Sequence, residues 1–310
     1  MSAREATWAL VLSAARMAEA LDHDDRACAF AVDECGGLMP VTAEGEGAVL
    51  AWRPGHGWHS RLPSTDPRAD LLDLYLPLCS ATASRPIVLG HLGQSLDGFI
   101  ATESGDSQFV TGQANVVHMH WLRGLCDAVV VGAGTVATDD PQLTTRHVSG
   151  PHPLRAIFDP SRRLTPGYKV FTDAVAPTLY FCRPEHVVAG ETMMGQAPIV
   201  SLSPADAGGA PAALLRLLQA RGCSRVFIEG GGVTVSAFLE AGLLDRLHLA
   251  VAPVIIGGGR PAIRLRPPAE LRHCPRPAYR VYRMGGDVLF DCDLRASATA
   301  EPRAGISRIL

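Results

Sequence analysis

The sequence lacks a hydrophobic run of the length that a membrane helix needs, which is about 18 residues or more. The apolar residues 8–12 follow Arg4 and have the character of a short signal-peptide core. However, Arg16 and Glu19 continue this segment at helical spacing, and no small-residue cleavage site follows it. We therefore expect neither a membrane span nor export.

Paired cysteines and an excess of one charge are also lacking. The eight cysteines include no Cys-x-x-Cys pair, and most of them lie beside apolar residues, where a free thiol behaves as a small hydrophobic group. A reducing, cytoplasmic location is therefore expected. The 28 lysines and arginines nearly balance the 31 aspartates and glutamates, which gives no argument for a nucleic acid or an anionic membrane surface as a partner.

A composition that is 47% hydrophobic and 19% charged is typical of a folded globular chain. Residues 79–86 are small and polar and end in proline, which indicates a linker near residue 85. The sequence thus predicts a small N-terminal region of unassigned role over 1–85 and a main domain over 86–295. The polar tail over 296–310 is expected to be flexible.

Two helices are predicted in the N-terminal region, over 6–20 and 66–78. Asp66 is the expected N-cap of the second helix, with Pro67 as its first residue. Residues 52–59, which lie between the helices, are expected to form a loop or a hairpin.

In the main domain, short apolar runs alternate with helical patterns. Runs that are apolar throughout are typical of strands covered on both faces, so we predict a three-layer α/β domain with a mostly parallel sheet. The pair Gly285-Gly286 between the last two strands indicates a hairpin and hence antiparallel strands at the sheet edge. The expected strands are 87–89, 128–131, 156–158, 178–181, 199–200, 225–228, 248–251, 279–283 and 287–293, and the expected helices are 113–125, 211–221 and 233–241.

Two predicted strand-to-helix turns are rich in glycine, at residues 131–135 and 228–234. Glycine lets a ligand approach the backbone closely, and the free N–H groups at a helix start attract phosphate. One such turn by itself favours tight turning alone, but two in one parallel-sheet domain favour a dinucleotide or phosphate ligand. Neither turn is a Rossmann fingerprint or a P-loop. A third glycine cluster, at 256–260 behind a strand ending at 255, is consistent with lining the site or with turning the chain, and the turn is favoured.

Three segments, in this order and spacing, resemble the pyrimidine reductase family of riboflavin biosynthesis. They are Gln94-Ser95-Leu96-Asp97-Gly98, the stretch from Gly132 to Arg146 that contains Asp139-Asp140-Pro141, and Ile228-Glu229-Gly230-Gly231-Gly232. The resemblance implies a dihydrofolate-reductase-like fold, a homodimer and NADPH as the cofactor. It also implies that the ribosylamino side chain of a phosphorylated pyrimidine is reduced to a ribitylamino chain, with hydride delivered to the sugar C1′ of an open-chain imine.

The resemblance also implies a set of site residues by position. The implied substrate contacts are Ser107, Arg123, Leu143, Arg146 and Glu229. The implied NADPH contacts are Gly93, Phe109, Thr135, Asp139, Gly231, Gly232, Val233, Thr234, Val235, Ser236 and Ala237, and the glycine-rich turns add Gly132, Gly134 and Gly230.

Five residues are candidates for contacts with the phosphate groups of the substrate and the cofactor. Arg123 on a predicted helix and Arg146 after a loop suit the substrate phosphate, because the planar guanidinium matches its oxygens. The alternative for each arginine is a solvated surface side chain. Ser161, Arg162 and Arg163 follow a strand and are candidates to meet the 2′-phosphate of NADPH, against the alternative of an exposed basic loop.

Glu229 is the predicted catalytic residue. It ends a central strand beside a glycine turn, so poor solvation is expected to raise its pKa. A protonated carboxyl there would assist the ring opening that precedes imine formation, and a carboxylate would bind sugar hydroxyls. The alternative is a residue that caps the start of its own helix. Asp97 is expected to be structural, because an Asp-Gly pair makes a turn unaided.

Two features depart from the family's pattern. Residues 1–85 lack the His-x-Glu and Pro-Cys-x-x-Cys motifs of the zinc deaminase domain that bifunctional members carry, so neither deamination nor a metal site is expected. His91 stands where many riboflavin enzymes have lysine, and its charge depends on pH. We expect His91 to contact the substrate, and the exact pyrimidine stays open.

The sequence therefore predicts an NADPH-dependent reductase of a phosphorylated ribosylamino-pyrimidine. Two alternatives stay open. One is a dihydrofolate-reductase-like enzyme that reduces another imine or a pterin-like ring. The other is a non-catalytic nucleotide-binding module.

Overall fold

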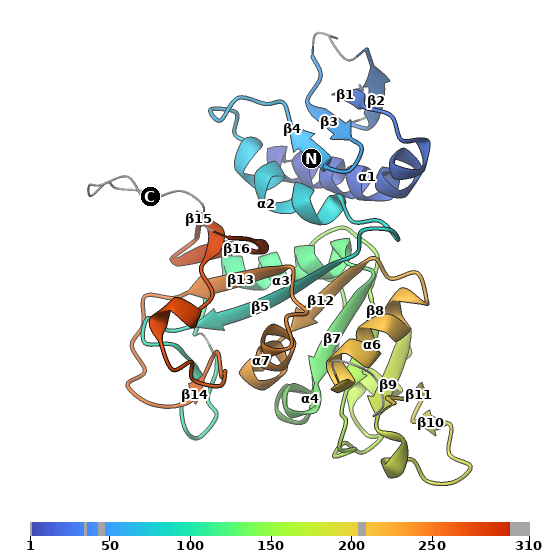
Figure 1. The fold of residues 1–310 in the computed structure, drawn as a ribbon, viewed down its shortest axis with the longest axis vertical. Coiled ribbons are helices and arrows are strands. Elements are labelled where there is room, and N and C mark those ends of the chain that lie inside the picture. The colour runs from blue at the N-terminus through green and yellow to red at the C-terminus, as the bar shows by residue number, and fades with distance from the viewer. Residues whose placement is uncertain (1, 34–35, 43–46, 109, 204–208, 298–310) are drawn as a thin grey trace. The chain divides into compact units, whose positions relative to one another are not determined.

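Figure 1 shows the fold in a computed structural model, which divides into two compact units, Met1–Ile87 and Val88–Leu310. None of the described helices is both long and apolar enough to cross a membrane. The tail expected to be flexible lies, from residue 298 on, outside the described residues. The structure describes residues 2–33, 36–42, 47–108, 110–203 and 209–297.

The first unit combines two helices with a four-stranded antiparallel sheet of order β2-β1-β3-β4. The first helix begins with a capping box, in which Ser2 and Glu5 each bond the other's backbone N–H. Trp52, Trp58 and Phe30 pack together in the core. The elements are α1 (Ala3–Asp24), β1 (Cys28–Val32), β2 (Leu38–Val41), β3 (Leu50–Arg53), β4 (Gly57–Ser60) and α2 (Ala69–Cys79).

The second helix begins later than the sequence pattern predicts. Asp66 is wrong as the N-cap and Pro67 as the first helical residue, because α2 starts at Ala69 and no side chain caps it. Asp66 Oδ1 instead accepts a hydrogen bond of 2.9 Å from the backbone N–H of Arg68, and its carboxylate pairs with the Arg68 guanidinium. The carboxylate is therefore used by the turn that precedes the helix.

A ten-stranded sheet forms the second unit, in the order β10-β11-β9-β8-β7-β12-β5-β13-β16-β15. The pairs β11–β9, β9–β8, β8–β7, β7–β12 and β5–β13 are parallel. Strand β10 at one edge and β16 and β15 at the other pair antiparallel. The predicted α/β class, with a mostly parallel sheet and antiparallel edge strands, is confirmed.

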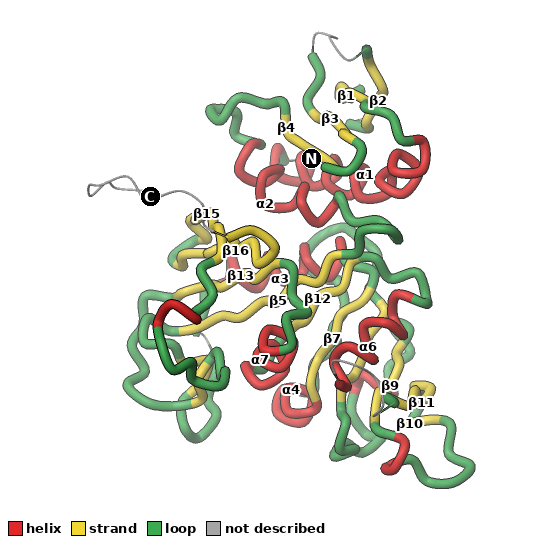
Figure 2. Tube along the Cα trace, viewed as in Figure 1, coloured by secondary structure: helices red, strands yellow, loops and turns green. Residues whose placement is uncertain are grey.

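Figure 2 distinguishes the helices from the strands of this unit. A separate two-stranded sheet pairs β14 with β6. The strands are β5 (Ile87–Gln94), β6 (Phe99–Ala101), β7 (Ala128–Gly132), β8 (Leu154–Phe158), β9 (Thr178–Cys182), β10 (Met193–Met194), β11 (Ala197–Ser201), β12 (Arg225–Glu229), β13 (Arg246–Val251), β14 (Arg260–Pro261), β15 (Pro277–Met284) and β16 (Asp287–Ser297). The helices are α3 (Gln113–Leu125), α4 (Ala133–Asp139), α5 (Lys169–Thr172), α6 (Gly209–Gln219) and α7 (Gly232–Glu240), with short 3-10 turns at Pro184–His186 and Leu271–His273.

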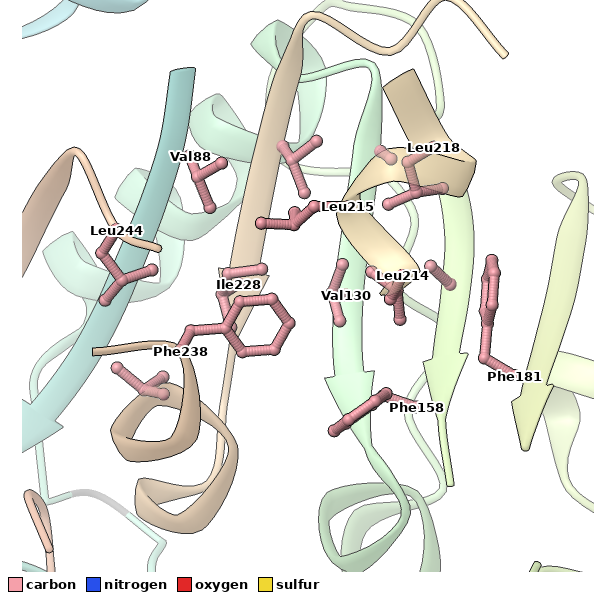
Figure 3. Close-up of a cluster of buried hydrophobic side chains, with 14 of the residues drawn as sticks. Val88, Val130, Phe158, Phe181, Leu214, Leu215, Leu218, Ile228, Phe238 and Leu244 are labelled. Carbon is pink, nitrogen blue, oxygen red and sulfur yellow. The ribbon is translucent and has the colours of Figure 1, made fainter. Parts of the chain in front are cut away.

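Successive side chains along the central strands point to opposite faces of the sheet, so they contribute to two separate layers. Ile228 of β12 and Val130 of β7 pack with Leu214 of α6 and Phe238 of α7 in an apolar core, as Figure 3 shows. The next residue on β12, Phe227, faces the other side of the sheet, where its ring meets that of His91 at 6.4 Å between centroids. Helix α3 covers that second face (Figure 1), which completes the three layers.

The strand that the sequence pattern extends to residue 255 ends earlier, at Val251. The residues that follow form a loop held by Asp97, whose carboxylate accepts hydrogen bonds from the backbone N–H groups of Ile256 at 3.1 Å and Gly257 at 2.6 Å. The hydrogen bond from Ser95, together with these backbone bonds, holds the pKa of Asp97 at about 2. Asp97 is therefore a structural anion that joins two loops.

Candidate active site

The carboxyl ends of neighbouring parallel strands border a pocket of about 620 Å³. β7 ends at Gly132, β8 at Phe158 and β12 at Glu229, and all three residues line the pocket. His91 and Gly93 of β5 add to its wall. Ligands of open α/β sheets bind at this end of the strands.

Both glycine-rich turns reach this pocket. Gly132 precedes α4 and Gly231 precedes α7, and neither helix start has a side-chain cap, so backbone N–H groups there are available to a ligand. Gly230 has φ +84°, a left-handed conformation that favours glycine. A Cβ on Gly132 would lie 2.0 Å from Thr234 Oγ1, so glycine allows the two turns to approach each other.

The pocket brings together most of the residues that the sequence analysis assigns to the site. Phe109 lies outside the described residues. Leu143 is buried and Ser161 lies on the loop after β8, and the pocket wall includes neither of them. Val235 lies in the apolar core, and Ser236 Oγ accepts a hydrogen bond from the backbone of Arg264. The predicted residues that line the pocket are His91, Gly93, Ser107, Gly132, Gly134, Thr135, Asp139, Glu229, Gly230, Gly231, Gly232, Val233, Thr234 and Ala237.

Arg123 and Glu229 form a buried ion pair. Arg123 Nε donates to Glu229 Oε2 at 2.7 Å, and a second contact joins Arg123 Nη2 to Glu229 Oε1. The two residues are 6% and 7% exposed. Burial works against the charge on Arg123, but the Glu229 carboxylate outweighs it and raises the arginine's pKa. The alternative of a solvated Arg123 is therefore wrong, and its guanidinium holds the pocket's carboxylate in place.

Arg146 shares a neighbour with Arg123 but is itself exposed. Its Nη1 donates to Thr144 Oγ1 at 2.7 Å, while Arg123 Nη1 donates to the carbonyl oxygen of Thr144 at 3.3 Å. Burial and the positive charge of Arg123 lower the pKa of Arg146. The two guanidinium groups thus meet at one residue, beside the Glu229 carboxylate and outside the wall of the pocket.

The loop after β8 turns Arg163, and not Arg162, toward the pocket. Arg162 has φ +51°, its guanidinium pairs with Glu191, and its Nη1 donates to the carbonyl oxygen of His186 at 2.7 Å. Arg163 lines the pocket with a side chain that is 68% exposed. Of the three candidates on this loop, only Arg163 therefore lines the pocket.

Two further arginines of the pocket wall escaped the sequence analysis. Arg260 ends the third glycine cluster, for which the sequence favoured a turn over a place in the site wall, and Arg264 follows it. Arg260 packs over the turn at Gly105, where a Cβ would lie 2.5 Å from Arg260 Nη2. Burial raises the pKa of Asp139, and the charge of Arg260 offsets part of that effect. A basic residue directly after three glycines was the signal that could have identified this wall.

His91 is a buried, uncharged part of the pocket wall. It is 2% exposed, and its Nε2 lies 2.9 Å from Asn115 Oδ1. Burial lowers the pKa of His91 to about 4, so the imidazole is neutral at neutral pH. Among the described residues, no cluster of three His, Cys, Asp or Glu side chains is arranged to hold a metal ion.

The chain is similar to several named proteins. The 2,5-diamino-6-ribosylamino-4(3H)-pyrimidinone 5′-phosphate reductase of Methanothermobacter thermautotrophicus is 33% identical over 180 residues, which is 56% of this chain and 81% of that protein. The riboflavin biosynthesis protein RibD of Aquifex aeolicus is 32% identical over 179 residues, which is 57% of this chain and 49% of that protein. The chain therefore spans about half the length of that RibD relative.

A solved structure has the same fold. It is a diaminohydroxyphosphoribosylaminopyrimidine deaminase/5-amino-6-(5-phosphoribosylamino)uracil reductase from Thermotoga maritima, with a TM-score of 0.57 and 26% identity over 73% of this chain and 60% of that one. Residues 86–276 match the family model of the RibD C-terminal domain. These residues are more than half of the chain and contain the pocket, so the chain belongs to the RibD C-terminal domain family.

Proposed function

We propose that residues 86–295 are an NADPH-dependent reductase that converts the ribosylamino side chain of a phosphorylated pyrimidine to a ribitylamino chain. Membership of the RibD C-terminal domain family supports a reductase acting in riboflavin biosynthesis. The observation that carries the proposal is the single pocket in which two uncapped glycine turns face a buried, arginine-paired carboxylate. All residues of that pocket lie between 91 and 264, so we assign the activity to the second unit.

The pocket fits a phosphorylated dinucleotide. The starts of α4 and α7 would hold the pyrophosphate, and Arg163 would pair with the 2′-phosphate that distinguishes NADPH from NADH. Arg260 and Arg264 add positive charge to the wall beside α7. When bound, the cofactor supplies the hydride for the reduction.

The substrate would lie beside Glu229, Ser107 and His91. Because Arg123 contacts both carboxyl oxygens of Glu229, the side chain is held in one orientation, which suits the binding of sugar hydroxyls. The exposed Arg146, next to this ion pair, is the proposed partner of the substrate phosphate.

The direct test is oxidation of NADPH by the purified full chain in the presence of a pyrimidine substrate. We expect NADPH to be consumed with 5-amino-6-(5-phosphoribosylamino)uracil or with its 2,5-diamino-4-pyrimidinone counterpart, and the ribitylamino product to appear in equal amount. Turnover with only a pterin or an unrelated imine would instead favour the alternative reductase. NADPH binding without turnover of any of these compounds would identify a binding module.

The variant Arg163→Ala tests the contact proposed for the 2′-phosphate. We expect its Kd for NADPH to rise roughly tenfold or more, because a charge-assisted hydrogen bond contributes about 1.5–3 kcal/mol. The Kd for NADH should stay the same. The control is Arg162→Ala, which removes the neighbouring arginine that pairs with Glu191. Equal losses for both nucleotides in Arg163→Ala would contradict the assignment.

The variant Glu229→Gln separates substrate binding from proton transfer. Glutamine keeps the size and some hydrogen bonding of Glu229 but loses its charge, so we expect KM for the pyrimidine to rise roughly tenfold while kcat changes little. Glu191→Gln, which alters an arginine-paired glutamate outside the pocket wall, is the control and should leave KM unchanged. A fall in kcat at constant KM would instead show that Glu229 transfers a proton.

A further inference from the structure

Three buried histidines form a row beneath the pocket, between α3 and the sheet. His91 of β5 and His248 of β13 are cross-strand neighbours, and His248 is in turn the neighbour of Asp291 on β16. His118 of α3 lies over this row. Its ring stacks on His248 at 5.1 Å and tilts toward His91 at 5.4 Å between centroids. None of the four side chains belongs to a residue more than 2% exposed.

Hydrogen bonds define which nitrogen of His91 can accept a proton. Asn115 Nδ2 donates to Thr111 Oγ1 at 2.9 Å, which orients the amide so that its Oδ1 faces His91 Nε2. An amide oxygen only accepts, so Nε2 carries the hydrogen and donates it. The lone pair of the neutral ring is therefore on Nδ1, and His91 is the member of the row that lines the pocket.

The far end of the row meets a cluster of arginine and aspartate side chains. Arg246 is shared between Asp291, at 2.6 Å, and Asp293, at 3.4 Å, so one guanidinium faces two carboxylates. His248 Nε2 lies 3.2 Å from Asp291 Oδ1, an ion-pair distance without a formed hydrogen bond. His118 Nε2 and His248 Nδ1 lie 3.1 Å apart in a hydrogen bond, which links the second and third histidines of the row.

The groups around His91 keep it neutral. Burial lowers its pKa to about 4, and a charge on His248 opposes a second charge on the ring. Asn115 and the more distant Glu229, which is paired with Arg123, offset part of this effect. His118 adds a neutral ring, because burial and the charges of His248 and His91 hold its pKa well below the usual range.

We propose that His91 is the catalytic proton shuttle that opens the sugar ring of the substrate, and that His118 and His248 are positioning residues that keep it neutral. The proposal rests on the proposed function. Nδ1 takes the proton from the exocyclic nitrogen while the C1′=N bond forms and the C1′–O4′ bond breaks. The imidazolium then returns that proton to O4′. The step yields the open-chain imine, consumes no net proton and needs no co-reactant.

A neutral imidazole suits this step better than Glu229 or the arginines of the wall. Both carboxyl oxygens of Glu229 are engaged by Arg123, so neither is free to exchange a proton with O4′. Arg163, Arg260 and Arg264 keep their protons at any working pH. Lysine at position 91 would be a permanent cation, whereas buried histidine accepts and returns a proton within one step.

The test follows ring opening without reduction. Opening and reclosing of the ring exchanges the α and β anomers of the phosphoribosylamino-pyrimidine, which exchange NMR measures on the full chain in the absence of NADPH. We expect the wild-type chain to accelerate this exchange and His91→Gln to lose it by roughly a hundredfold or more, the usual contribution of general acid–base catalysis. His186→Gln, at an exposed histidine, is the control. Wild-type exchange rates in His91→Gln would overturn the proposal.

A second variant tests the row without touching the pocket. His248→Asn removes the group whose charge opposes a charge on His91, so the pKa of His91 rises. The exchange rate requires neutral His91 and falls as pH drops through that pKa, so we expect the acidic limb of the pH profile to move upward by about one unit. A purely structural role would lower the rate at every pH without moving the limb, and that result would overturn the role of the row.

These experiments distinguish the proposed reductase function from the proposed role of His91. Equilibrium binding of NADPH to each variant shows that the nucleotide site is intact, because none of the substituted residues belongs to it. If the wild-type chain exchanges the anomers but does not oxidise NADPH, the proposed function fails and ring opening stands. If it reduces the pyrimidine while His91→Gln exchanges anomers normally, the reductase stands and His91 is not the shuttle.

Discussion

The variant Arg123→Ala is expected to lose about 3–5 kcal/mol of unfolding free energy, because it leaves the Glu229 carboxylate buried without its partner. Both contacts to that carboxylate come from the one guanidinium, and Glu229 is only 7% exposed. Denaturant unfolding measures the loss. At pH 7 we also expect a weaker affinity for the pyrimidine, because an unrestrained Glu229 no longer keeps one orientation in the pocket.

A double-mutant cycle isolates the ion pair from the lost packing. Arg123→Ala combined with Glu229→Ala removes both charges, so the double variant should be more stable than the sum of the two single losses predicts. The control is Arg266→Ala. Arg266 pairs with Glu240 through a side chain that is 90% exposed, and its removal should cost less than about 1 kcal/mol. A loss of similar size in Arg123→Ala would show that the buried pair does not hold the site together.

The main features of the second unit could be predicted from apolar runs alone, because strands covered on both faces carry no polar alternation. Helix α3 was predicted with its observed ends, residues 113–125. The short elements were missed, among them β14, whose two residues hold their place by pairing with β6. The end of β13 at Val251 agrees with the predicted strand 248–251, whereas Pro253 and its apolar neighbours continue the pattern of a strand to residue 255 although they belong to the loop that Asp97 holds.

The parts of the site that are formed by glycine-rich turns or by the family motifs could be predicted from the sequence. The contacts of individual side chains, which depend on residues far away in the sequence, were harder to predict. Arg162 and Arg163 are adjacent arginines that the sequence alone does not distinguish. The positive φ of Arg162 directs its side chain toward Glu191, whereas the side chain of Arg163 lines the pocket. Arg123 could be assigned to phosphate or solvent from the sequence, but its carboxylate partner lies 106 residues away. The histidine row could not be predicted either, because His91, His118 and His248 are brought together only by the register of the sheet and by the packing of α3.

The variant Gly232→Ala is expected to reduce NADPH affinity by roughly a hundredfold or more and to cost about 1–3 kcal/mol of stability. An added Cβ would lie 2.3 Å from the carbonyl oxygen of Ala262 and 2.6 Å from that of Pro261, and neither backbone atom can rotate away. The methyl group must therefore separate the start of α7 from the segment that carries Arg260 and Arg264. Because these two arginines and the α7 turn form one wall of the pocket, the nucleotide site opens.

Gly134→Ala is the matched control for the loss of stability, since this glycine lines the same pocket but has no atom within 4 Å of the added Cβ. It lies inside α4 at negative φ, where alanine favours the helix by up to about 1 kcal/mol, so the Tm should be kept or raised. Affinity for NADPH should still fall if the cofactor lies over the start of α4, because the methyl group enters the space that it would occupy. Titration calorimetry and thermal unfolding of both variants distinguish the two effects. If Gly232→Ala binds NADPH as the wild type does, the contact between α7 and residues 261–262 does not shape the nucleotide site, and the cofactor must lie elsewhere in the pocket.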